Sequence, residues 1–180
     1  MRSIAIFSAA LLLSGAVTLG VSSAADMSKG REQSKPADKY DNAETCSKLL
    51  ADRDGAGLKP DQRRRCLIAV ASTYIDAEEM SLAFDKQITT DDLSRHLLGM
   101  AANRKAGNRA EMIKSQVASS PVILAIRDRK WLVDGNQAWI HYNGYLKAEP
   151  DHPKFIVMER LTIENGKITE ILVAGVAEPR

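Results

Sequence analysis

This chain of 180 residues has little of what a metal site or a nucleic-acid-binding surface requires. It contains only three histidines and two cysteines, and their spacing matches no zinc-ligand pattern. Its formal net charge of +2 leaves no basic excess for binding nucleic acid. The remaining composition, 44% hydrophobic and 27% charged, is typical of a globular domain and excludes collagen, a coiled-coil rod and a wholly disordered chain. We therefore expect one domain with no metal, no cofactor and no nucleic-acid partner.

Long apolar runs are also scarce. The longest, residues 4–16, follows the positively charged start of the chain and precedes the small residues of 21–25. Its 13 residues are fewer than the roughly 20 that a bilayer-spanning helix needs. This order predicts a secretory signal peptide, residues 1–25, cut after Ala25. A retained membrane anchor is the alternative. Cleavage would leave a secreted or periplasmic protein without a membrane anchor.

The two cysteines are expected to form a disulfide if the chain is exported. Cys46 and Cys66 would then meet an oxidising environment, in which an isolated pair forms a structural disulfide. Closing a loop of this size stabilises a fold by roughly 3 kcal/mol in the chain-entropy model. A redox-active pair is the alternative, but it favours the close spacing of Cys-x-x-Cys.

The rest of the chain divides into a tether, a helical half and a strand half. Residues 26–42 have almost nothing to bury, which predicts a flexible tether before a domain at 43–180. Apolar residues recur at helical spacing from Pro60, but after Pro121 the period changes to two. Hairpin turns are predicted at Asp134-Gly135 and Asn165-Gly166. Strands joined by hairpins are antiparallel, so we predict an α+β domain with helices packed on one face of the sheet.

The last predicted hairpin places a carboxylate on its apolar face. A two-residue turn pairs Glu164 with Lys167, and continuing this register puts Glu159 on the covered face. Its expected neighbours there are Val157, Leu161 and Leu172. Loss of hydration should raise the pKa of Glu159, which makes it a candidate acid–base or hydrogen-bond-donor residue. The alternative is a glutamate at the sheet edge or one paired with an arginine.

From Pro60 onward the sequence resembles a secreted branch of the nuclear-transport-factor-2-like superfamily, which includes SnoaL-like polyketide cyclases and ketosteroid isomerases. The resemblance rests on Cys66-Leu67 with Tyr74-Ile75-Asp76-Ala77, on residues 107–113, on 131–134 and on 159–171. It implies a cone-shaped domain, a cystatin-like roll, in which a curved antiparallel sheet wraps the N-terminal helices around a pocket. It also implies a small apolar ligand in that pocket and a homodimer formed through the convex sheet face.

The same resemblance implies a catalytic set. Ketosteroid isomerases use a helix tyrosine and a protonated carboxylic acid as oxyanion donors, with a separate aspartate as base. Tyr74, Glu159 and Asp91 match these roles, and Asp92 matches the base almost as well. Two departures weaken the match: Glu replaces the strand Asp, and the Asp-Pro-x-Gly context of the base is absent. Limonene epoxide hydrolases need an Arg-x-Asp pair where residues 140–143 read Ile-His-Tyr-Asn, so that activity is excluded.

Two functions therefore remain open. The first is a binding module, an exported domain with a pocket for a small apolar ligand. The candidate ligand-binding residues are Trp131, Trp139 and Tyr142, although aromatic strand residues also fill cores and interfaces. The second is a cofactor-free isomerase or cyclase, with Asp91 as general base and Tyr74 and Glu159 as oxyanion donors. The enzyme requires these three side chains to converge on one cavity.

Overall fold

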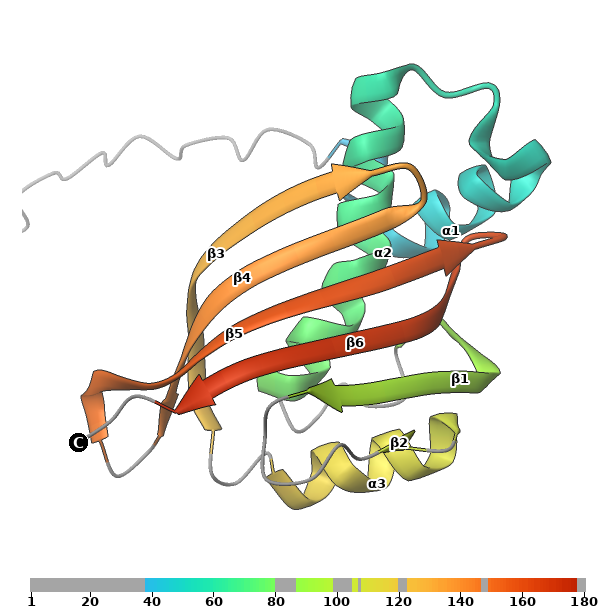
Figure 1. Ribbon diagram of the computed structural model, residues 1–180. Helices are drawn as coiled ribbons and strands as arrows, with labels where there is room; N and C mark the ends of the chain where they lie inside the picture. The colour runs from blue at the N-terminus through green and yellow to red at the C-terminus, as the bar shows by residue number, and fades with distance from the viewer. Residues whose placement is uncertain are drawn as a thin grey trace, which may run out of the picture. The chain divides into compact units, whose positions relative to one another are not determined.

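Helices precede strands along the chain, except that one helix follows the first two strands (Figure 1). The computed structural model describes residues 38–79, 87–98, 105–106, 108–119, 123–146 and 149–177. The signal peptide predicted at 1–25 and most of the predicted tether lie outside these residues. The helices are η1 (Lys39–Asp41), α1 (Ala43–Ala51), η2 (Asp52–Gly55), α2 (Pro60–Glu79) and α3 (Arg109–Ser119). The strands are β1 (Thr89–Leu98), β2 (Lys105–Ala106), β3 (Ile123–Asp134), β4 (Gln137–Leu146), β5 (Glu149–Glu164) and β6 (Lys167–Ala177).

The described strands form one open sheet in the order β2-β1-β6-β5-β4-β3. As predicted, β3 to β6 form an antiparallel meander. The expectation of a wholly antiparallel sheet is wrong, because β1 runs parallel to β6 and the sheet is mixed. Hairpin signals could not reveal this direction, since β1 and β6 are far apart in sequence and no hairpin joins them. The α+β fold class and the curved sheet are confirmed (Figure 1).

The longest helix, α2, packs on one face of this sheet, which we call the inner face. Strand residues alternate between buried and more exposed positions, so each strand of the meander contributes every second side chain to the core. The opposite, outer face carries Trp139, His141, Met158 and Arg160. The largest fully buried apolar side chains between α2 and the inner face include Leu67, Tyr74, Ile75, Leu93, Ile140, Leu161 and Ile171. None of the described helices has the length and apolar character needed to cross a bilayer.

A disulfide joins α1 to α2, as the isolated cysteine pair predicted. Cys46 and Cys66 are bonded, with their Cα atoms 4.8 Å apart, and both are fully buried. Local signals explain where the two helices begin. Asn42 caps α1 by accepting a hydrogen bond from the Thr45 amide at 2.8 Å, and Pro60 occupies the first turn of α2.

The last residues of the predicted tether belong to the folded domain. Asp38 and Asp41 both form ion pairs with Arg65 of α2, at 2.9 and 2.7 Å. The Tyr40 side chain is partly buried and packs against the core. Residues 38–41, which the sequence analysis assigned to the tether, therefore contact α2 and the core. These residues show no apolar period because ion pairs with Arg65, rather than an apolar stripe, hold Asp38 and Asp41.

The β5–β6 hairpin follows the predicted register for two pairs and then shifts. Glu164 lies opposite Lys167 and Ile163 opposite Ile168, as expected. An extra residue, Thr169, then bulges out of β6, so that Glu159 lies opposite Val173 rather than Leu172. The predicted neighbour Leu172 is therefore wrong. Glu159 nonetheless keeps its predicted face, because the bulge lies in β6 and leaves the alternation of β5 intact.

Candidate functional site

Five polar side chains meet in the interior between α2 and the inner face of the sheet. Tyr74 and Glu159 are 0% and 1% exposed, and Glu78 and Tyr142 are 7% and 5% exposed. The Arg95 side chain is 11% exposed. We call these five residues the acid cluster. Burial of so many polar groups in one place is costly unless they bind one another or a ligand.

Ordinary periodicities bring the acid cluster together. Tyr74 and Glu78 are four residues apart on α2, so they lie on the same helix face. The other three members lie on different strands, Arg95 on β1, Tyr142 on β4 and Glu159 on β5, each at an inward position of the alternation. The sheet register then aligns them across the face that α2 covers.

Hydrogen bonds connect all five members. Glu78 Oε1 accepts from the Tyr74 hydroxyl at 2.6 Å and from Arg95 Nη2 at 3.0 Å. The Tyr142 hydroxyl lies 2.7 Å from Glu159 Oε1 and 3.3 Å from Glu78 Oε2. A phenol has one proton, and the shorter separation favours donation to Glu159. Glu78 is therefore the common acceptor of the cluster, and Tyr142 connects the two carboxyl groups.

The two carboxyl groups have different environments. Burial, with the nearby Glu78 carboxylate as a further cause, raises the pKa of Glu159 to about 8. Arg95 and the hydrogen bond from Tyr142 oppose this shift of the Glu159 pKa only in part. Burial also raises the pKa of Tyr74 and of Tyr142 well above the usual value, so both remain hydroxyl donors. At neutral pH most Glu159 side chains are thus neutral acids, while Glu78 forms an ion pair with Arg95.

Two polar atoms of the acid cluster have no partner among the described residues. They are Glu159 Oε2 and Arg95 Nε, and both are buried. Because Tyr142 donates to Oε1 of Glu159, the acid proton belongs on Oε2. Both unpartnered atoms then carry hydrogen-bond donors. A buried donor without an acceptor is rare in folded proteins and calls for an explanation, such as a water molecule or a ligand.

The structure brings together only part of the predicted catalytic set. Tyr74 and Glu159 lie in the same cluster, but the Tyr74 hydroxyl already donates to Glu78. Asp91 and Asp92 are both exposed on β1 and form no hydrogen bond with the cluster. Asp91 instead borders a separate depression of about 430 Å³ with Arg109 and the start of α3. Neither aspartate is placed to act as a base on a ligand bound at Glu159.

The predicted ligand-binding aromatics are also divided. Tyr142 belongs to the acid cluster, whereas Trp131 and Trp139 border a depression of about 250 Å³ with Leu132 and Met158. Arg160 lies over the Trp139 ring at 5.9 Å. The three aromatic residues thus lie on different faces of the sheet: Trp139 points to the outer face, whereas Tyr142 and Trp131, which is opposite the buried Ile140, lie on the inner side.

Glu78 and Arg95 are the cluster members that the sequence analysis missed. A signal for Glu78 exists, because it follows Tyr74 by four residues on a helix whose buried face was predicted. Arg95 has a weaker signal, since it alternates with Leu93 and Leu97 on a strand. The alternative of an arginine paired with Glu159 is not what the structure has, because Arg95 donates to Glu78.

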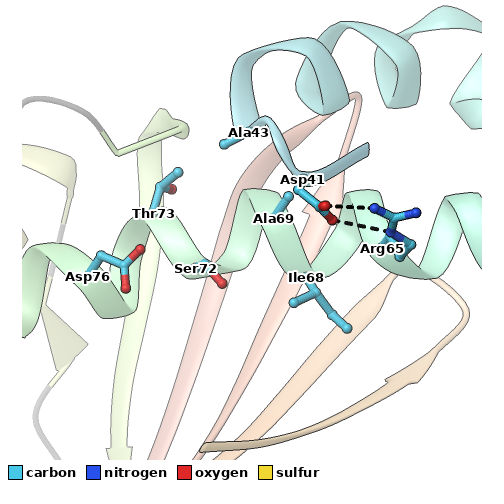
Figure 2. Close-up of a pocket in the computed structure, with 8 residues that line it drawn as sticks. All are labelled: Asp41, Ala43, Arg65, Ile68, Ala69, Ser72, Thr73 and Asp76. Atoms are coloured by element: carbon cyan, nitrogen blue, oxygen red, sulfur yellow. Dashed lines mark hydrogen bonds and ion pairs between the residues drawn. The ribbon is translucent and has the colours of Figure 1, made fainter. Parts of the chain in front are cut away.

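A third depression, of about 340 Å³, runs along α2 beside Asp41 and Ala43 (Figure 2). Arg65 and Asp41 lie at one end and Asp76 at the other, with Ala69 and Ser72 between them. Its charged groups are already paired, Arg65 with Asp41 and Asp76 with Arg129 at 2.7 Å. It offers no unpartnered charge to a ligand, so the acid cluster is the stronger candidate site. No group of three or more potential metal ligands occurs among the described residues.

Solved structures share this fold at low sequence identity. An NTF2-like protein of unknown function from Burkholderia xenovorans matches with a TM-score of 0.53 and 13% identity over 63% of this chain and 85% of that one. A protein assigned as a ketosteroid isomerase from Kribbella flavida matches with a TM-score of 0.50 and 17% identity over 63% and 82% of the two chains. A de novo designed protein with a curved β-sheet matches with a TM-score of 0.51, 16% identity and coverage of 63% and 85%.

These matches establish an NTF2-like fold, as the sequence resemblance implied, but at such identities they establish no activity. Comparison with curated proteins gives no significant match. One family model matches residues 60–174, from the start of α2 almost to the end of β6. It is described as a domain of unknown function, DUF8021. Because this match spans well over half of the chain, the protein belongs to the DUF8021 family.

Proposed function

We propose that this protein binds a small molecule at the acid cluster, with the Glu159 carboxyl group as its main polar contact. The observation that carries this proposal is the fully buried Glu159, whose Oε2 atom has no partner among the described residues while Oε1 is held by Tyr142. A ligand that accepts a hydrogen bond from Oε2 would satisfy this group. The NTF2-like fold supports the proposal, since it is compatible with ligand binding or catalysis.

Binding is better supported than catalysis. Proton-transfer chemistry would need a base within reach of the same ligand, and Asp91 and Asp92 are exposed outside the cluster. Glu78 is the nearest carboxylate in the network, but Tyr74 and Arg95 both donate to its Oε1 atom. Both donors therefore already occupy this oxygen. The isomerase or cyclase alternative thus lacks a free base among the described residues.

Small molecules that co-purify with the protein provide the test. Native mass spectrometry and solvent extraction should find a ligand on the wild-type protein that is lost in Glu159→Leu. This substitution removes the donor but suits the apolar neighbours Val157 and Leu161. Glu164→Leu makes the same change at an exposed position of the same strand and should keep the ligand. A ligand retained equally by both variants, or absent from the wild type, would contradict the proposal.

We also propose that the protein acts after export from the cytoplasm. The signal-peptide pattern of residues 1–25 supports export, and the buried disulfide between α1 and α2 is compatible with an oxidising compartment. Cell fractionation of the full chain, followed by mass spectrometry, should find an exported protein beginning at Asp26 with no free thiol. Ala25→Arg should block the cleavage. A full-length chain with two reduced cysteines would refute export.

A further inference from the structure

The acid cluster leaves two buried polar atoms without a partner among the described residues. At Glu78, Tyr74 and Arg95 donate to Oε1, and Oε2 lies 3.3 Å from the Tyr142 hydroxyl. These two atoms, Glu159 Oε2 and Arg95 Nε, are both donors when Glu159 holds its proton. A ligand that binds them must therefore offer acceptors, such as carbonyl oxygens.

The charge of the cluster is already balanced. Arg95 supplies the cation, and Glu78 neutralises it at 3.0 Å. The charged side chain nearest in sequence on α2, Glu79, is paired outside the cluster with Arg129 of β3. The facing residues of β6, Ile171 and Val173, are apolar. A ligand carboxylate would therefore add a second buried anion, and the described residues offer no free cation to stabilise it, which is strongly unfavourable.

We propose that Glu78 determines ligand specificity by occupying Arg95, so that the acid cluster accepts uncharged ligands bearing a hydrogen-bond acceptor and rejects carboxylates. This inference rests on the proposed function, because it concerns a ligand bound at the same cluster. Glu78 acts here through Arg95, while Glu159 remains the polar contact. Without Glu78, the Arg95 guanidinium would be free to bind an anion, for which its planar pair of donors is well suited.

Removing Glu78 alone would not isolate this effect. Arg95 could then pair with an ionised Glu159, which would again occupy the cation. The informative variant is Glu78→Gln combined with Glu159→Gln, which leaves Arg95 as the unpaired charge of the cluster. Glutamine at 78 can still accept the hydrogen bond from Tyr74, and glutamine at 159 can still accept the one from Tyr142. The shape and the hydrogen bonds of the cluster are thus largely kept.

Two probes of nearly equal shape provide the test: 2-acetylnaphthalene, an uncharged ketone, and 2-naphthoate, a carboxylate. Equilibrium dialysis at pH 7 should show that the wild type binds the ketone at least tenfold more tightly than the carboxylate. The double variant should reverse this preference. Glu159→Gln with Glu170→Gln is the matched control, because Glu170 also pairs with an arginine, Arg160 at 2.7 Å, but outside the cluster. This control should not gain affinity for naphthoate.

Each outcome decides something different. A wild type that binds both probes equally, or prefers naphthoate, overturns the specificity role of Glu78 and leaves the proposed binding function standing. A wild type that binds neither probe counts against both. Equal gains of naphthoate affinity in the double variant and the control would show an effect of overall charge and refute the proposal. If the double variant does not fold, Glu78→Asp still tests it, since this variant keeps the carboxylate and should keep the ketone preference.

Discussion

At the scale of single residues, Glu159 makes stability depend on pH. Its folded pKa of about 8 lies above the ordinary value of 4.5, so the folded state holds this proton more tightly than the unfolded state. The contribution of Glu159 to stability is therefore fully present below about pH 4.5 and is lost as pH rises through 8. Glu159→Gln removes this loss and should stabilise the protein at pH 8 by on the order of a few kcal/mol, with little effect near pH 4.

Chemical denaturation at both pH values measures this difference, and Glu164→Gln on the exposed end of β5 serves as the control. The control should change stability little at either pH. A Glu159→Gln variant less stable than wild type at pH 8 would mean that Glu159 is charged and paired in the folded protein. The neutral donor required by the proposed function would then be lost.

At the scale of elements, the β5–β6 turn contacts the backbone of α1. Gly166 has a φ of +73°, and a Cβ atom there would collide with the Ser47 carbonyl oxygen of α1. Gly135, in the β3–β4 turn, has a similar φ of +58° but open space around it. Gly166→Ala should therefore destabilise the protein clearly more than Gly135→Ala, whose cost of roughly 1 kcal/mol reflects backbone conformation alone. Thermal melts of the two variants measure the difference, and equal costs would show that the turn and α1 separate readily.

At the scale of the whole molecule, the outer face of the sheet is the proposed site of self-association. The large apolar side chains that are most exposed among the described residues are Leu98, Leu132, Ile156 and Met158. The last three lie on the meander, and two shallow depressions meet there at His141 and Met158. Exposed apolar patches of this kind are typical of protein interfaces. With the superfamily resemblance, this favours the homodimer that the sequence analysis expected.

Sedimentation velocity should therefore find a dimer at micromolar concentration, and Met158→Glu should shift it to monomer because the new charge would be buried in the interface. Thr162→Glu introduces the same charge on the same strand, close to the turn and away from both depressions, and should leave the dimer intact. A wild-type protein that is monomeric at all concentrations would exclude this use of the outer face.

Much of the fold was predictable because local rules determine it. The spacing of apolar residues predicted α2 and the meander, and the turn dipeptides predicted both hairpins. The presence of only two cysteines predicted the disulfide. Predictions failed where distant segments meet. The parallel pairing of β1 with β6 carries no turn signal, and no local pattern marks the bulge at Thr169. The ion pairs of Asp38 and Asp41 with Arg65 depend on where α2 lies in space.

At the candidate site, too, local patterns predicted some features and contacts between distant segments decided the others. By itself, the sequence determined that Glu159 points to the covered face, because alternation along one strand depends only on backbone geometry. The tertiary structure alone decided that Arg95 pairs with Glu78, that Tyr142 joins the two carboxyl groups, and that Asp91 lies outside the cluster. These contacts unite four separate elements, and their energies depend on distances and burial that no local pattern contains.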